Sequence, residues 1–139
     1  MNGLENTTLL VGRILMSAIF VHGGWGKLLA AAATQALFGD KLGLPMPMFA
    51  WLLAVVVELG GGLLLLVGLF TRPVGLVLAA WCVATALIAH TNLADRAQEI
   101  NFYKNMAMTG GFLYVFAFGA GAYSLDAVWW RRRSATVPG

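Results

Sequence analysis

Residues 49–70 read FAWLLAVVVELGGGLLLLVGLF, an apolar stretch that contains one charged residue, Glu58. A transmembrane helix needs about 20 apolar residues, because the hydrocarbon core of a bilayer is about 30 Å thick. Thr71-Arg72-Pro73 follows directly, and residues 73–90 form a second apolar stretch. A connection this short predicts that the two spans are antiparallel neighbours.

Two further apolar stretches lie outside this pair, at residues 8–33 and 101–123. The region before the first carries Glu5 and no basic residue, so we interpret this stretch as a retained span rather than a signal peptide. Asp95 and Gln98 have the spacing of a capping box, which indicates that the last helix starts before the membrane does. The sequence therefore predicts an all-α, integral membrane four-helix bundle that forms one domain over residues 1–139.

The composition agrees with a membrane protein. Of the 139 residues, 60% are hydrophobic and 11% are charged, and the mean hydropathy is +0.79. A soluble domain has roughly 25% charged residues, so the composition disfavours soluble single-domain enzymes, disordered tails and fibrous repeats. The net charge of +3 is too small for a nucleic-acid partner. The single cysteine, Cys82, cannot form a disulfide within the chain.

The positions of the basic residues predict the orientation of the chain. Arg131-Arg132-Arg133, together with Arg13 and Arg72, indicates that both termini are cytoplasmic, because basic residues are retained on that side. Residues 131–139 are expected to form a basic, disordered cytoplasmic tail. The bias is modest, since three basic residues fall on the other side: Lys41, Arg96 and Lys104.

Ionisable residues within a span cost about 2.5–3.5 kcal/mol near the bilayer centre, so they are functional candidates. At a rise of about 1.5 Å per residue, His22 lies about 21 Å, Glu58 about 18 Å and His90 about 25 Å above the cytoplasmic face. Asn101 and Asn105 lie at a similar or greater height. The sequence therefore predicts a polar pocket in the outer half of the bilayer, rather than a channel through it.

Glu58 is the most informative of these residues. Without a partner we expect it to be protonated, because burial disfavours the charged carboxylate. Beside His22, Lys27 or Lys104 it could stay ionised. Two interpretations remain open: a proton-accepting or hydrogen-bonding group for a polar ligand, or an inter-helix hydrogen bond that fixes the register of the bundle.

Other polar and aromatic residues have simpler interpretations. Trp25 is a candidate ligand contact or an interface anchor, because tryptophan is enriched at membrane surfaces. Arg13, Arg72 and Asp126 are assigned to structural contacts near the inner interface. The two histidines are a weak indication of haem, and a zinc site needs three or four ligands, so no metal site is predicted.

Taken together, these motifs resemble the DoxX family of small bacterial membrane proteins. The most specific match is Glu58-Leu59-Gly60-Gly61-Gly62 followed by Gly68-Leu69-Phe70-Thr71-Arg72. One departure is Ala122, where a basic residue is expected. The other matching elements are His22-Gly23-Gly24 to Lys27-Leu28, Pro45-Met46-Pro47, His90, Asn101 with Asn105, and Gly121 to Asp126.

The resemblance implies a four-helix bundle in a bacterial inner membrane. Some members are linked with quinone-coupled oxidation of thiosulfate, and others with membrane oxidoreductase assemblies that handle oxidative or thiol stress. The site residues that the resemblance carries over are His22, Glu58, Arg72, His90 and Asn101.

Three functions are consistent with these observations. The first is a redox-associated subunit that binds a quinone or similar lipophilic ligand, with no intrinsic cofactor. The second is a structural or assembly subunit of a membrane oxidoreductase complex or homo-oligomer. The third, a small-solute transporter, is disfavoured because the polar groups cluster in one half of the bilayer. In the first, Glu58 and His22 would accept or relay protons, and the ligand would be bound by His90, Asn101, Asn105, Lys104 and Trp25.

Overall fold

The computed structural model describes residues 2–135, and over this range the chain forms helices and no strand. Short helical segments connect or follow the long ones: α2 (Ala31–Ala36), the π-helical η1 (Leu37–Lys41) and α7 (Leu125–Ala135). The long helical columns are α1 (Gly3–Leu29), α3 (Pro47–Val55) continued through the π-helical η2 (Val56–Gly60) into α4 (Gly61–Val67), α5 (Thr71–Ala89) and α6 (Arg96–Phe118).

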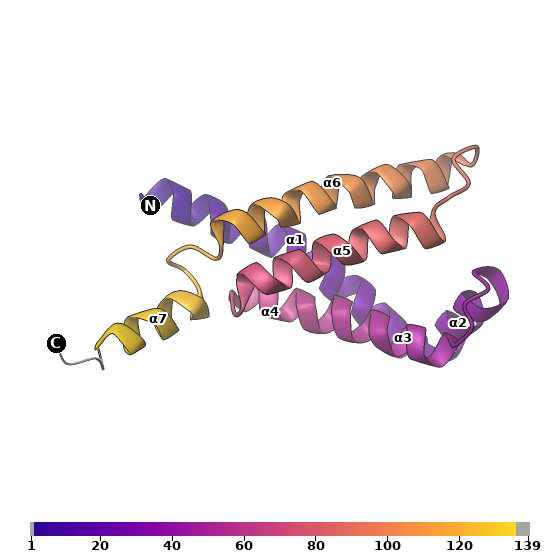
Figure 1. The fold of residues 1–139 in the computed structure, drawn as a ribbon, viewed down its shortest axis with the longest axis horizontal. Helices are drawn as coiled ribbons and strands as arrows, with labels where there is room; N and C mark the ends of the chain where they lie inside the picture. Colours follow the sequence, from indigo (N-terminus) through magenta and orange to yellow (C-terminus); the bar gives the residue numbers. More distant parts are fainter. Residues whose placement is uncertain (1, 136–139) are drawn as a thin grey trace.

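The helical columns pack side by side along one long axis (Figure 1). α5 lies against α6 over most of its length and also contacts α4, whereas α1 packs on η2 and α4. The start of α1 and the whole of α7 lie at one end of the bundle, called here the α7 end. The opposite end, called the α2 end, holds α2, η1 and the loop between α5 and α6.

Among the described residues, three columns are long and apolar enough to cross a membrane: Gly3–Leu29, Pro47–Val67 and Thr71–Ala89. α6 has 23 residues, and a helix of that length is about 34 Å long at a rise of about 1.5 Å per residue. Its charged residues lie in its first half, and the second half is apolar. The predicted all-α, membrane-embedded bundle is confirmed.

The start of α6 differs in one detail from the predicted capping box. The Asp95 carboxylate accepts a hydrogen bond from the backbone N–H of Ala97 at 2.8 Å, so Asp95 does cap the helix. Gln98 does not reach back to Asp95. Its Oε1 instead lies 2.7 Å from Nδ1 of His90, the residue that ends α5. This contact joins the two sides of the α5–α6 loop.

The turn between α4 and α5 is held by a residue from α7. Gly68 ends α4 in the left-handed conformation (φ 69°), which glycine adopts without steric cost. The Asp126 carboxylate then accepts hydrogen bonds from the backbone N–H groups of Phe70 at 2.8 Å and Thr71 at 2.9 Å. Asp126 therefore supplies the cap of α5, because no residue just before Thr71 does so.

Arg13 crosses from α1 to the same turn and is only 1% exposed. Its Nη2 donates to the carbonyl oxygen of Tyr123 at 2.6 Å. The guanidinium also packs directly against Gly68, where an added Cβ would overlap it. A cation at this point is stabilised by the carbonyl end of α4. Arg72, by contrast, is exposed at the start of α5.

Residues 131–135 continue α7, so the expected disordered tail does not begin at Arg131. Arg131, Arg132 and Arg133 are part of the helix that starts at Leu125. Residues 136–139, the remainder of the expected tail, lie outside the described residues.

The buried core lies between the α2 end and the α7 end. The Phe20 and Phe112 rings meet edge to face, with centroids 5.1 Å apart. Around them pack Leu65, Leu78, Ala79, Cys82 and Val115. Many apolar residues on the outer faces of the helices are exposed, as expected where lipid rather than water is the solvent.

Candidate functional site

Glu58 lies in the π-helical turn η2, at the centre of the α3–α4 column, and is only 8% exposed. A π turn is rare and occurs mostly as a single insertion within an α-helix, frequently at a functional site. Here it carries a carboxylate inward between α1 and α5. The local backbone therefore presents a charged side chain to the interior of an apolar bundle.

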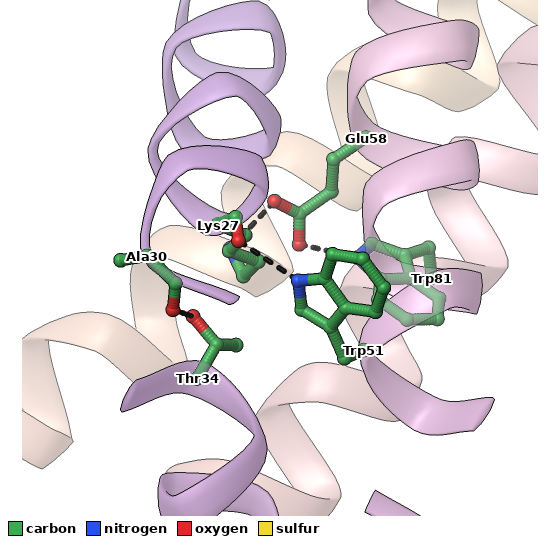
Figure 2. A network of polar contacts seen from close by, with 6 residues as sticks. All are labelled: Lys27, Ala30, Thr34, Trp51, Glu58 and Trp81. Carbon is green, nitrogen blue, oxygen red and sulfur yellow. Dashed lines mark hydrogen bonds and ion pairs between the residues drawn. The ribbon is translucent and has the colours of Figure 1, made fainter. Parts of the chain in front are cut away.

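Each carboxylate oxygen of Glu58 contacts a donor from a different helix (Figure 2). Lys27 Nζ, from α1, lies 2.6 Å from Oε2, and Trp81 Nε1, from α5, donates to Oε1 at 3.0 Å. The side chains of Lys27 and Glu58 are 30% and 10% exposed. The two opposite charges offset each other, and the contact connects three helical columns.

The end of α1 is also fixed by α3. Trp51 Nε1 donates to the backbone carbonyl of Lys27 at 2.8 Å (Figure 2). Carbonyls in the last turn of a helix lack a partner within the helix, so this bond satisfies one of them. The Thr34 hydroxyl donates to the carbonyl oxygen of Ala30 at 3.0 Å, in addition to the backbone N–H of Thr34. The position of Lys27 is thus set by its backbone as well as by its ammonium.

Two adjoining cavities lie beside Glu58. The smaller one, called the polar cavity, has a volume of about 170 Å³ and lies between α1 and α6. The larger one, called the apolar cavity, has a volume of about 350 Å³ and lies between α3 and α5, beside η1. The residues that line both are Lys27, Glu58, Trp81, Thr85 and His90.

Five residues singled out from the sequence lie at the polar cavity: Lys27, Glu58, His90, Lys104 and Asn105. Asn101 does not line it but supports two that do. Its side-chain oxygen accepts from Lys104 Nζ at 2.7 Å, and its backbone carbonyl accepts from Asn105 Nδ2 at 2.8 Å. Polar groups from four different helical columns thus converge at the α2 end.

His22 and Trp25 are not brought to this site. Both are exposed, Trp25 by 53%, and neither lines the two cavities. The reason is the rotation of the helix. Lys27 and Gly23 share one face at a spacing of four residues, and His22, five residues from Lys27, points well away from that face. Of the three partners considered for Glu58, namely His22, Lys27 and Lys104, the structure pairs it with Lys27.

The sequence reasoning did not identify Trp81 and Thr85 as site residues. They are four residues apart and so occupy one face of α5, which is the face toward Glu58. A hydroxyl one turn from a tryptophan in an apolar span was a pattern visible in the sequence. Among residues 2–135, no three His, Cys, Asp or Glu side chains gather in a group that could hold a metal ion.

Comparison with known proteins gives the family of the chain. The DoxX family model matches residues 8–91. The chain belongs to the DoxX family. This DoxX protein is 40% identical over 126 residues to the inner membrane protein YqjF of Escherichia coli K12, a match that covers 91% of the chain and 95% of YqjF. It is 37% identical over 123 residues to the inner membrane protein YphA of the same organism, with 85% and 87% covered. No solved structure matches it.

Proposed function

We propose that this protein is a multi-pass bacterial inner membrane protein with cytoplasmic termini, and that its cavities beside Glu58 bind a quinone or a similar lipophilic ligand. Its function would be that of a redox-associated subunit. The inner membrane names of the relatives YqjF and YphA support the location. α7 lies at the same end of the bundle as the start of α1 (Figure 1), which supports two termini on one side.

The observation that carries the proposal is the arrangement of donors beside an apolar space. Lys104 donates one of its three N–H groups to Asn101 and keeps the other two for further hydrogen bonds. His90 Nδ1 donates to the side-chain oxygen of Gln98, which leaves Nε2 of the neutral ring as a hydrogen-bond acceptor. Both side chains line the polar cavity. Ligand sites combine apolar walls with a few placed polar groups. The remaining N–H groups of Lys104 suit the carbonyl oxygens of a quinone ring, and Nε2 of His90 suits a hydroxyl group of its reduced form.

Glu58 has a different task from the donors. Both of its oxygens already have partners, so it is oriented before any ligand arrives. A carboxylate held in this way can accept a proton from a hydroxyl group of a reduced ligand, with Lys27 offsetting the charge. The electrons released when that ligand is oxidised would have to pass to a partner subunit, and this chain would bind and orient the ligand.

The test measures binding of a benzoquinone probe and of its reduced hydroquinone form by the purified full-length protein in nanodiscs. Glu58→Gln keeps the size of the side chain and is expected to weaken binding of the hydroquinone about ten-fold, since a charge-assisted hydrogen bond from its hydroxyl group contributes about 1.5–3 kcal/mol. Glu99→Gln removes a carboxylate that pairs with Arg96 at the exposed start of α6, and it should leave binding unchanged. Absence of saturable binding by the wild-type protein would refute the proposal.

A second function is favoured by one specific observation. The contacts of Glu58 with Lys27 and Trp81 tie three columns together, which is how polar residues stabilise membrane bundles. In a structural or assembly subunit, these inter-helix contacts would be the whole role of Glu58. It predicts that Glu58→Gln lowers the melting temperature and the yield of any complex, while probe binding is absent or unaltered.

A transporter is the least supported function. A buried apolar layer lies between the site and the α7 end. α4, α5 and α6 contribute Leu65, Leu78 and Phe112 to it, respectively. A tightly packed apolar layer of this kind has no path for a polar solute. Flux measurements in proteoliposomes would test it.

A further inference from the structure

We propose that the two cavities are the two parts of one site, for an amphiphile with a ring-sized polar head and a single hydrocarbon chain. The head would occupy the polar cavity, and the chain would occupy the apolar cavity. This inference rests on the proposed binding function and specifies the ligand class and its direction of approach.

The volumes favour a shared occupant. Ligand pockets in proteins hold about 300–1,000 Å³. The polar cavity, at about 170 Å³, is smaller than that range and cannot hold a long ligand alone. The apolar cavity of about 350 Å³ lies within it but offers few polar groups. A ligand that uses both cavities has enough room and meets both kinds of wall.

The two cavities adjoin along α5, because five residues line both of them. Trp81, Thr85 and His90, all at α5 or its end, line both cavities. Glu58 and Lys27 face both from the other side. A ligand that lies along α5 would therefore pass from the donors of the polar cavity to an apolar surface without leaving the protein.

The chemistry of the walls fixes which part of the ligand goes where. A hydrocarbon chain in the polar cavity would strip water from Lys104 and Asn105 without replacing their hydrogen bonds, which is unfavourable. The residues that line only the apolar cavity all have hydrocarbon side chains, among them Phe38, Leu44, Ala50, Leu53, Ala84 and Ile88. The chain therefore belongs there and the head beside Lys104.

The apolar cavity also reaches the outer surface of the bundle. Leu53 on α3 and Ile88 on α5 line the cavity and are 42% and 51% exposed. Both lie in columns long and apolar enough to cross a membrane, so their exposed faces meet lipid. The ligand would thus arrive sideways from the bilayer between α3 and α5, with its chain trailing outward.

The experiment compares two probes with the same head, 2,3-dimethoxy-5-methyl-1,4-benzoquinone and its 6-decyl derivative. Ala84→Phe fills the apolar cavity from α5. Ala80→Phe, one turn away on the same helix, adds the same ring at an exposed position. Binding of each probe to each full-length variant is measured in nanodiscs. Because each comparison uses one probe, partitioning of the decyl chain into lipid cancels.

We expect Ala84→Phe to weaken binding of the decyl probe about ten-fold, because ring and chain cannot occupy the same packed space. The chainless probe should change less than about two-fold, since its head does not reach Ala84. Equal effects on the two probes, or none, would overturn the two-part site while the proposed binding function stands. If neither probe binds the wild-type protein, both proposals fail.

A second measurement does not depend on the folding of a variant. A decyl probe that carries a diazirine at the chain end is photo-crosslinked to the wild-type protein, and the labelled peptides are identified by mass spectrometry. Labelling within residues 37–53 or 84–89 is expected. Labelling confined to α6 or α7 would contradict the inference.

Discussion

Glu58 is held by Lys27 and Trp81, and each of the three side chains comes from a different helical column. Removing one member of a buried ion pair costs more than the pair contributes, because the other charge remains in a poorly solvating environment. The Lys27 side chain is 30% exposed, so part of this cost is relieved by solvent. The contact is therefore expected to be moderately stabilising.

We predict that Lys27→Met destabilises the folded protein by about 1–3 kcal/mol, because the carboxylate loses its charged donor. Lys27→Met combined with Glu58→Gln should recover part of the loss, since the charge left behind is also removed. Thermal unfolding in detergent, followed by circular dichroism, measures both. Lys41→Met, at an exposed position of η1, is the control. Additive effects of the two substitutions would show that the pair is not coupled.

How far the sequence predicts the site depends on what a helix position reveals. Rise per residue gives the height of a side chain, and it placed Glu58, His90 and Asn105 at one level. Height does not give direction, which depends on how each helix is rotated against its neighbours. His22 lies near the right level but on the wrong face, whereas Lys27 reaches Glu58 from one turn beyond Gly23.

Among the elements, α1 and η2 approach each other most closely at Gly24. An added Cβ there would lie 2.5 Å from the backbone nitrogen of Leu59. The backbone of Leu59 cannot move without disturbing the π turn that positions Glu58. The absence of a side chain at Gly24 is thus what lets Lys27, three residues later, reach the carboxylate.

We predict that Gly24→Ala destabilises the protein by about 1–3 kcal/mol, as overpacking of a tight contact does. Gly26→Ala, on the same helix, meets nothing within 4 Å of its new Cβ. It should be neutral or stabilising by up to about 1 kcal/mol, because alanine favours helix. Thermal unfolding of the two variants gives the comparison. Equal melting temperatures would contradict the close approach of α1 and η2.

The elements themselves were largely predictable, because long apolar stretches bounded by Pro, Gly and charged residues specify membrane helices directly. The π turn at Val56–Gly60 was not, since residues 49–70 contain no local pattern that distinguishes it from a regular helix. Neither was the His90–Gln98 contact. Gln98 had a plausible local partner in Asp95, and only the meeting of α5 and α6 provides the competing one.

At the scale of the whole molecule, four helical columns carry the chain back to the end where it starts. Asn2 and Val128 are exposed near that end, and Asn92 is exposed in the α5–α6 loop. If all four columns cross the bilayer with cytoplasmic termini, Asn92 faces the periplasm, whereas Asn2 and Val128 face the cytoplasm. Cys82 is fully buried, and replacing it by alanine gives a background without cysteine.

We predict that, in this background, Asn92→Cys reacts with a membrane-impermeant maleimide in intact spheroplasts. Asn2→Cys and Val128→Cys should react only after the membrane is permeabilised, because the arginine-rich end of the chain favours the cytoplasmic side and the start of α1 lies at the same end of the bundle. The extent of labelling is read on a gel. Reaction of Asn92→Cys and Val128→Cys from the same side would mean that α6 does not cross.

The cap of α5 has a consequence for biosynthesis. Asp126 lies 55 residues after Thr71 in the chain, yet its carboxylate accepts a hydrogen bond from the backbone N–H of Thr71. During translation α5 leaves the ribosome and enters the lipid before its acceptor has been made. The first turn of α5 must therefore rely on headgroups or water until α7 arrives. A helix synthesised later therefore completes the first turn of α5, so α5 reaches its final structure only after α7 has been made.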